Sequence, residues 1–176
     1  MNLNLGCFNK KLPGFVNVDI REEVNPDVVD DCFTLKKFDA GSADLIYCCH
    51  MLEHLDYKEA AIALARWKEV LKPGGILRLS VPDLEATFAH YFYHKDLNKL
   101  MHTIYGSQRH QFDYHKNGWD FDRLKSNLEE VGFNGIAKWD WRTTDPHSYC
   151  DDYSQAYCPH MDKTGKLMSL NVEGIA

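Results

Sequence analysis

The segments Met1-Asn-Leu-Asn-Leu-Gly-Cys-Phe8 and Val16-Asn-Val-Asp-Ile20 decide the fold of this chain. Each is a short apolar run typical of a strand, and the first ends at Gly6 while the second ends at Asp19. A glycine just past a strand lets the backbone approach a ligand closely. A carboxylate at the tip of the neighbouring strand can accept hydrogen bonds from both hydroxyls of a ribose. Gly6 and Asp19 at these two strand ends therefore predict a nucleoside-binding edge on an open parallel sheet.

Apolar runs and polar or helical segments alternate in the pattern of a doubly wound α/β sheet. Near-continuous apolar strands are typical of a sheet that is covered on both faces. The predicted strands are Met1 to Leu5, Phe15 to Ile20, Asp44 to Cys49 and Gly75 to Val81, with a weaker one at Val28 to Asp31. The predicted fold class is thus α/β, with a Rossmann-like, mostly parallel sheet.

The rest of the chain divides into helices, a loop and two closing strands. Helical spacing of apolar residues predicts helices between Cys49 and Pro73, from Leu84 to Tyr105, and from Phe121 to Gly132. Residues 106–120 show almost no periodicity, which is typical of a functional loop or lid. The closing strands are predicted at Ile136 to Trp141 and at Lys166 to Val172.

Composition excludes several classes of function. The 176 residues carry 20 Lys and Arg against 26 Asp and Glu, a formal charge of −6, and no basic run exceeds the pairs Lys10-Lys11 and Lys36-Lys37. We therefore expect no nucleic-acid partner. No apolar stretch reaches the roughly 18 residues of a membrane helix, so we expect no membrane partner. The N-terminus lacks the layout of a secretory signal, and the cytoplasm is the expected compartment.

Metal binding is not expected from the sequence. The six cysteines include no C-x-x-C pair, and a cytoplasmic chain keeps its thiols free. His50-Met-Leu-Glu53-His54 matches the H-x-x-E-H pattern of an inverted zinc protease, in which both histidines bind zinc. That pattern needs both histidines well inside one helix, and His50 follows a buried strand too closely. The favoured interpretation is a helix start, with Glu53 near the positive end of the helix dipole.

Five sequence marks in one order carry a family resemblance. They are Leu3-Asn-Leu-Gly-Cys7, the acid Asp19, the pair Asp31-Cys32, the segment Ser42 to Leu55 with its Leu-Glu-His-Leu, and Leu71-Lys-Pro-Gly-Gly75-Ile-Leu-Arg-Leu. With these marks the chain resembles class I S-adenosylmethionine-dependent methyltransferases of the small type-11 kind. The resemblance implies a single domain over residues 1–176 whose last strand is antiparallel. It also implies a cofactor-binding half in residues 1–82 and a substrate-side half in residues 83–176.

The resemblance assigns roles to residues at the strand ends. In the family the glycine loop passes under the methionine part of S-adenosylmethionine, the acid ending the second strand holds the ribose hydroxyls, and an acid after the third contacts the adenine amino group. Those positions here are Gly6, Asp19 and Asp31. The segment around Cys49 and His50 would line the methyl donor from the other side. The full predicted cofactor-binding set is Leu5, Gly6, Cys7, Asp19, Ile20, Asp31, Cys32, Cys49 and His50.

The glycine loop departs from the family pattern. Where the family has an acid followed by glycines at every second position, this chain has Asn4, Gly6, Phe8 and Lys10. Only nine residues separate Gly6 from Val16, whereas a parallel crossover normally needs about a dozen or more. We therefore expect the first helix to be reduced to a turn or an irregular arm. The chain also begins directly at the first strand, which leads us to expect a homodimer whose partner covers the pocket.

Methyl transfer relies mostly on alignment of the two reactants, so at most one general base is expected. His50 is best placed near the donor methyl group, and His110 and His115 lie in the irregular loop. These three histidines are the candidate catalytic residues, and the expected acceptor is a small molecule. Tyr105, Gln108, Asp113 and Tyr114 are further candidates for holding it.

Two other functions stay open at this point. The first is a degenerate, non-catalytic member of the same fold that needs a partner chain, which the eroded glycine loop favours. In that case the side chain of Phe8 or Lys10 should block the pocket. The second is a nicotinamide-dependent oxidoreductase, which also places an acid at the end of the second strand. The single glycine and the Lys-Pro-Gly-Gly run count against it.

Overall fold

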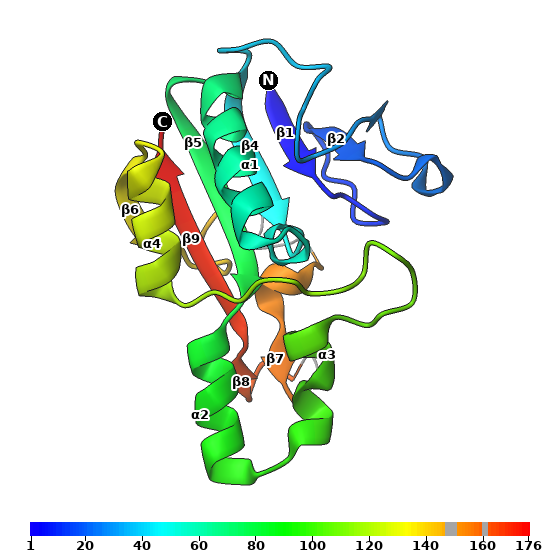
Figure 1. The fold of residues 1–176 in the computed structure, drawn as a ribbon, viewed down its shortest axis with the longest axis vertical. Helices are drawn as coiled ribbons and strands as arrows, with labels where there is room; N and C mark the ends of the chain where they lie inside the picture. Colours follow the sequence, from blue (N-terminus) through cyan, green and yellow to red (C-terminus); the bar gives the residue numbers. More distant parts are fainter. Residues whose placement is uncertain (147–150, 160–161) are drawn as a thin grey trace.

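The chain folds around one mixed seven-stranded sheet (Figure 1). The computed structural model describes residues 1–146, 151–159 and 162–176. The strand order is β3-β2-β1-β4-β5-β9-β6, with β1 Asn2–Leu5, β2 Val16–Asp19, β3 Val28–Val29, β4 Ala43–Cys49, β5 Leu71–Pro82, β6 Asn134–Lys138 and β9 Ser169–Ile175. Strands β1 to β5 pair in parallel, and β9 is antiparallel to both β5 and β6. The predicted fold class, including the antiparallel C-terminal strand, is confirmed.

The central strands form the middle of the hydrophobic core. β1 lies between β2 and β4, with Leu3 opposite Val16 on one side and Ile46 on the other. Leu3, Ile46 and Leu77 are all 0% exposed. Because both faces of these strands are covered, their sequences read as near-continuous apolar runs, interrupted by a few polar residues such as the buried Asn4. The four apolar strands predicted from the sequence are therefore present, whereas the weaker fifth is shortened to Val28–Val29.

The helix between β4 and β5 begins later than predicted. A 3-10 helix, η2 (Leu52–His54), follows β4, and α1 spans Tyr57–Val70. The Asp56 side chain accepts hydrogen bonds from two backbone N–H groups of the first turn, and the Glu59 carboxylate accepts from the Asp56 N–H. This capping box fixes the start of α1. The prediction of a helix starting directly after Cys49 is thus wrong, and so is the placement of Glu53 at its N-terminal end.

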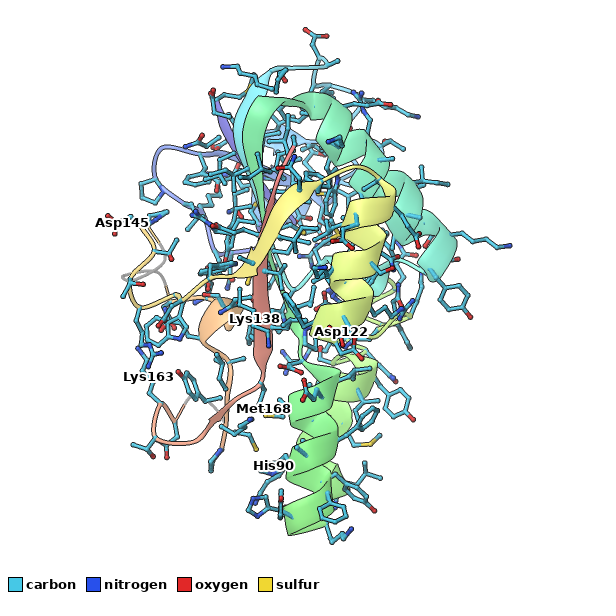
Figure 2. The ribbon with its side chains drawn as sticks, turned by 90° about the vertical axis from the view of Figure 1, so that its left-hand side faces the viewer. His90, Asp122, Lys138, Asp145, Lys163 and Met168 are labelled. Atoms are coloured by element: carbon cyan, nitrogen blue, oxygen red, sulfur yellow. The ribbon has the colours of Figure 1, made fainter. Side chains whose placement is uncertain are left out.

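The two faces of the sheet are covered in different ways. Figure 2 shows α1 and α4 (Phe121–Glu130) on one side of the sheet and the segment containing Asp145 and Lys163 on the other. On this second side lies a small apolar cluster, to which the described residues contribute no α-helix, and its buried members are Leu12, Tyr47, Trp139 and Trp141. The irregular segment after β6 therefore takes the place of helices on that face.

The connection from β1 to β2 contains no helix, as its length predicts. The Asn4 side-chain amide donates to the Lys10 carbonyl and to the Asn17 side-chain oxygen, both at 2.9 Å. The same Asn17 oxygen accepts from the Leu12 N–H at 2.8 Å. These two asparagines are 3% and 5% exposed, so their amides replace the missing helix as buried anchors for an irregular arm.

The predicted helix from Leu84 to Tyr105 is broken into three pieces. They are α2 (Leu84–His94), the 3-10 helix η3 (Leu97–Leu100) and α3 (Met101–Tyr105). Lys95 caps α2 in the left-handed region with φ +52°, and this turns the chain back on itself. Among the described helices, none has the length and apolar character needed to cross a membrane. Residues 106–120 are irregular as predicted, apart from one isolated bridge between Trp119 and Asp83.

The C-terminal strands differ in detail from the prediction. β6 begins and ends earlier than the predicted strand at Ile136 to Trp141. The second predicted strand is interrupted at Met168, which is 4% exposed and bonds to Ala156 and Asp83 outside the sheet ladder. Its first part, β8 (Lys166–Leu167), pairs with β7 (Tyr157–Cys158) in a hairpin that the sequence did not indicate. In the part of the chain that the structure describes, the remaining short helices are η1 (Glu22–Val24) and η5 (Tyr153–Gln155).

Candidate functional site

Four parallel strands end at one edge of the sheet, and each brings a distinctive residue there. Gly6 follows β1, Asp19 ends β2, Asp31 lies shortly after β3, and His50 follows β4. In Figure 1 this edge lies at the lower ends of β1 and β4, and the connection between α3 and α4 runs beneath it. Open parallel sheets bind ligands at the carboxyl ends of their strands, so this edge is the candidate site.

Gly6 brings the loops after β1 and β4 into contact. Its φ is +65°, in the left-handed region, and its N–H lies 3.2 Å from the Cys32 sulfur. A Cβ atom at this position would lie 2.8 Å from Cγ of Met51. Only glycine fits here, because any side chain would meet both backbone strain and the Met51 side chain.

Asp19 is a buried acid held by backbone and guanidinium donors. It is 4% exposed and accepts the Phe8 N–H at 2.9 Å, the Arg21 N–H at 3.0 Å and the Arg21 Nε–H at 3.3 Å. A carboxylate offers about four lone-pair sites. The three donors fix the orientation of Asp19 and leave about one site for a ligand.

The other predicted cofactor residues divide into buried and accessible ones. Leu5, Cys7 and Cys32 are buried, with exposures of 0%, 3% and 7%. Burial, the largest cause, raises the pKa of the Cys7 thiol to about 11 and that of Cys32 well above its ordinary value. These two thiols are therefore protonated at neutral pH and pack as small apolar groups. Ile20 is exposed, and Asp31 is half-buried with one carboxyl oxygen accepting from the Phe33 N–H.

His50 lies where β4 leaves the sheet, with a left-handed φ of +49°. Its Nε2 lies 2.8 Å from the Ser169 hydroxyl oxygen, and that hydroxyl donates to the Tyr153 carbonyl. Its Nδ1 lies 3.5 Å from Oε1 of Glu53. Burial, followed by the charges of two neighbouring histidines, lowers the pKa of His50 to about 3. The imidazole is consequently neutral at pH 7. Cys49, the residue before His50, is half-buried.

Glu53 lies between histidines that come from distant parts of the chain. Its Oε1 is 3.8 Å from Nε2 of His115, and the ring centroids of His54 and His115 are 4.9 Å apart. Glu53 is 1% exposed, and within the described part of the chain neither of its carboxyl oxygens makes a hydrogen bond. Burial raises the pKa of Glu53 to about 8 and lowers that of His115 to about 4. The loop is fixed against η2 because the N–H groups of residues 116 and 117 both donate to the Glu53 carbonyl.

The structure separates the third candidate histidine from the other two. His50 and His115 lie on either side of Glu53, whereas Nε2 of His110 lies 3.0 Å from Nη1 of Arg21. The tip of the loop thus reaches the residue that also contacts Asp19. Of the further acceptor candidates, Tyr105 and Tyr114 are exposed, Gln108 has a left-handed φ of +57°, and Asp113 bonds within the loop to the Ser107 hydroxyl and the Arg109 N–H.

Three residues of the site were not predicted as such. Arg21 connects Asp19 to the loop, and Glu53 and His54 face His115. The H-x-x-E-H pattern did signal the last two, but it was interpreted as the start of a helix. Its partner, His115, lies about sixty positions further on, so only the fold brings the group together.

Part of the chain is similar to a known family. The family model for a methyltransferase domain matches residues 13–79. A search of curated proteins found no match to this chain. The matched residues include β2 to β4 and most of β5, and with them the predicted ribose acid Asp19, the adenine acid Asp31 and the segment after β4.

Solved structures match the whole fold at low sequence identity. An S-adenosylmethionine-dependent methyltransferase from Archaeoglobus fulgidus is 16% identical with a TM-score of 0.61, covering 99% of this chain and 85% of that one. One from Mesorhizobium loti is 13% identical with a TM-score of 0.58, covering 99% and 90%. A complex of the Haloferax volcanii Trm112 methyltransferase activator with a candidate methyltransferase is 15% identical with a TM-score of 0.62, covering 99% and 81%. At these identities the likeness concerns the fold. Taken with the family match, it indicates S-adenosylmethionine as the cofactor.

Proposed function

We propose that this chain transfers a methyl group from S-adenosylmethionine to a small-molecule acceptor, because residues 13–79 match the model for a methyltransferase domain and the fold is like that of S-adenosylmethionine-dependent methyltransferases. The observation that carries the proposal is the convergence of Gly6, Asp19, Asp31 and His50 at the carboxyl ends of four parallel strands. That convergence supports a nucleoside site of the kind the fold uses.

The residues at this edge fit the cofactor. Asp19 would hold the ribose hydroxyls, Asp31 the adenine amino group, and the positive-φ backbone at Gly6 would pass close to the methionine part. The exposed side chain of Ile20 offers an apolar surface beside Asp19. The predicted neighbours Leu5, Cys7, Cys32 and Cys49 are buried or half-buried, so they would contribute backbone and packing. When bound, S-adenosylmethionine supplies an electrophilic methyl group on a sulfonium.

The acceptor side would lie between the end of β4 and residues 106–120. His50 and His115 face this region from the two segments, and His110 closes its far end beside Arg21. We infer that one of the three histidines takes the acceptor's proton and that the others position the acceptor. The net charge of −6 favours a small acceptor over a nucleic acid. Residues 106–120 would then act as the lid that their irregular sequence indicated.

Two observations favour the non-catalytic alternative. Asp19 already accepts three hydrogen bonds, and the Met51 side chain packs against Gly6. Of the two side chains expected to block the pocket, Lys10 extends to Asp151 at 3.0 Å. Phe8 is 48% exposed beneath the Arg21 guanidinium. The three hydrogen bonds leave Asp19 about one acceptor site for a ribose, and a chain whose site does not admit the cofactor would be a non-catalytic subunit.

The Asp19→Asn variant tests the proposed function. It keeps the shape of the side chain but removes its charge, and charge-assisted hydrogen bonds contribute about 1.5–3 kcal/mol each. We expect affinity for S-adenosylhomocysteine, measured by calorimetry, to fall at least about tenfold. Asp39→Asn is the matched control, because Asp39 is an exposed acid near the opposite end of β4. Equal affinity in the two variants would contradict the ribose assignment, and circular dichroism checks that Asp19→Asn still folds.

We further infer that two copies of the chain associate through α2. This helix exposes three aromatic side chains, Phe88 at 62%, Phe92 at 67% and Tyr93 at 78%. Phe88 lies one turn before Phe92, and Tyr93 follows Phe92 directly. Exposed apolar patches of this kind mark interaction surfaces. Sedimentation equilibrium should give a dimer for the native chain and a monomer for Phe92→Glu, whereas a native monomer would contradict the inference.

The cytoplasmic location stays a prediction.

A further inference from the structure

Glu53 is a buried carboxyl group without a hydrogen-bond partner among the described residues. It is 1% exposed, and its nearest polar neighbours are Nδ1 of His50 at 3.5 Å and Nε2 of His115 at 3.8 Å. Buried polar groups in native proteins are almost always satisfied by a protein group, a water or an ion. The orphaned carboxyl therefore points to a ligand that belongs between it and the histidines.

Hydrogen bonds on the outer side of the cluster fix the tautomers of two histidines. Nδ1 of His115 lies 2.9 Å from the Thr103 carbonyl, and Nδ1 of His54 lies 3.1 Å from the Tyr114 carbonyl. A carbonyl only accepts, so we assign the ring proton to Nδ1 in both residues. In the neutral imidazoles, each Nε2 then carries a free lone pair.

The distances suit a single ion. One ligand atom from each of Glu53, His54 and His115 can be chosen so that all three lie within 4.8 Å of one another. Zinc binds imidazole nitrogen and carboxylate oxygen at about 2.0–2.2 Å, so a small inward shift would bring the three atoms around one ion. Histidines that bind metals usually donate their other N–H to a backbone carbonyl or a carboxylate, which is what His54 and His115 do.

We propose that Glu53, His54 and His115 bind one divalent transition-metal ion, with zinc as the first candidate. The donor set of two imidazoles and one carboxylate suits zinc and iron better than calcium or magnesium. Three protein ligands leave a coordination position open, as in catalytic zinc sites. His50 stands beside the carboxyl group and outside the set, so with His115 on the ion, His50 and His110 are the histidines left to take the acceptor's proton. The sequence predicted no metal site. That prediction was based on the H-x-x-E-H pattern, which would place His50 and His54 on one helix, and it did not include His115.

Zinc titration of the full chain, freed of metal by a chelator, tests the proposal without any methyl donor. Calorimetry should show one zinc ion per chain. Substituting Co²⁺ should give visible absorption bands of a four- or five-coordinate site. Absence of zinc uptake would overturn the proposal and would leave Glu53 as a neutral acid among histidines.

Variants locate the site. Glu53→Gln and His54→Asn should each weaken zinc binding about 100-fold or more, beyond the 10–100-fold typical of losing an outer-shell partner. His54 is only partly buried, so its variant keeps the test valid if Glu53→Gln fails to fold. The control is the double variant His90→Gln/His94→Gln, which removes a second histidine pair whose rings lie 4.3 Å apart on α2. Binding lost in the control but kept in the other two variants would overturn the assignment.

Discussion

Replacing Gly6 with alanine should destabilise the protein through two separable effects. The first is backbone strain, because φ at Gly6 is +65° and the left-handed conformation costs an L-residue about 1–2 kcal/mol. The second is steric, because the new Cβ would lie 2.8 Å from Cγ and 3.0 Å from Cβ of Met51. Overpacking of this kind costs about 1–3 kcal/mol. The expected loss in free energy of unfolding is therefore about 2–5 kcal/mol, a large part of the about 5–15 kcal/mol typical of a domain.

Gly41 provides the matched control for this prediction. Its φ is also +65°, but an added Cβ would meet no atom within 4 Å, so Gly41→Ala should cost only about 1–2 kcal/mol. Urea unfolding followed by circular dichroism measures both variants. In a Met51→Ala background the cost of Gly6→Ala should fall but stay above the Gly41 value, since the 2.8 Å contact with Cγ is removed while the 3.0 Å contact with Cβ remains. Equal losses for Gly6→Ala and Gly41→Ala in the native background would refute the packing of Met51 against Gly6.

Three further predictions concern the scaffold of the site. Asp56→Ala removes the capping box of α1 and should lower the free energy of unfolding by about 1 kcal/mol in urea titrations, whereas no change would show that the cap is dispensable. Trp67→Phe leaves the Cys32 carbonyl without the indole N–H that now donates at 2.7 Å, and we expect a loss of about 2–3 kcal/mol by the same assay. The Lys72 ammonium at 2.7 Å is the first cause that lowers the pKa of Asp44 from 3.8 to about 2. A carboxyl group whose pKa is lower in the folded state stabilises the fold at pH values above its pKa in the unfolded state. This stabilisation is lost as the pH falls through its pKa in the folded state. The native chain and the Asp44→Asn variant should therefore differ in the midpoint of urea unfolding at pH 6, and this difference should disappear as the pH falls to about 2 and below. A difference that does not shrink would contradict the ion pair.

The parallel sheet could be predicted from the sequence because its central strands are buried on both faces. Runs such as Leu45 to Cys49 then become uninterrupted and apolar, and acids at strand ends, such as Asp19, stand out. The short arm after β1 was also predictable, because nine residues cannot hold a crossover helix. What covers the second face was not predictable, since the cluster around Trp139 and Trp141 comes from an irregular segment.

The candidate site was predictable only where it depends on strand ends. Gly6, Asp19 and Asp31 follow from the order of strands along the sheet. Contacts that join segments far apart in sequence, such as Arg21 with His110 or Glu53 with His115, leave no periodic signal. The break at Lys95 and the late start of α1 at Tyr57 were missed for another reason. A left-handed backbone residue ends α2, and the Asp56 side chain caps α1, and both overrode the apolar spacing that indicated longer helices.

Calorimetric titration of the native chain with S-adenosylmethionine and S-adenosylhomocysteine, with NAD as the control, tests the central claim most directly. Binding at the ends of β1, β2 and β4 predicts micromolar affinity for the first two and no binding of NAD, despite the three hydrogen bonds that Asp19 already accepts. No binding of any of the three would contradict the cofactor site and would favour a subunit without methyl-transfer activity. Binding of NAD alone would contradict the methyltransferase account altogether.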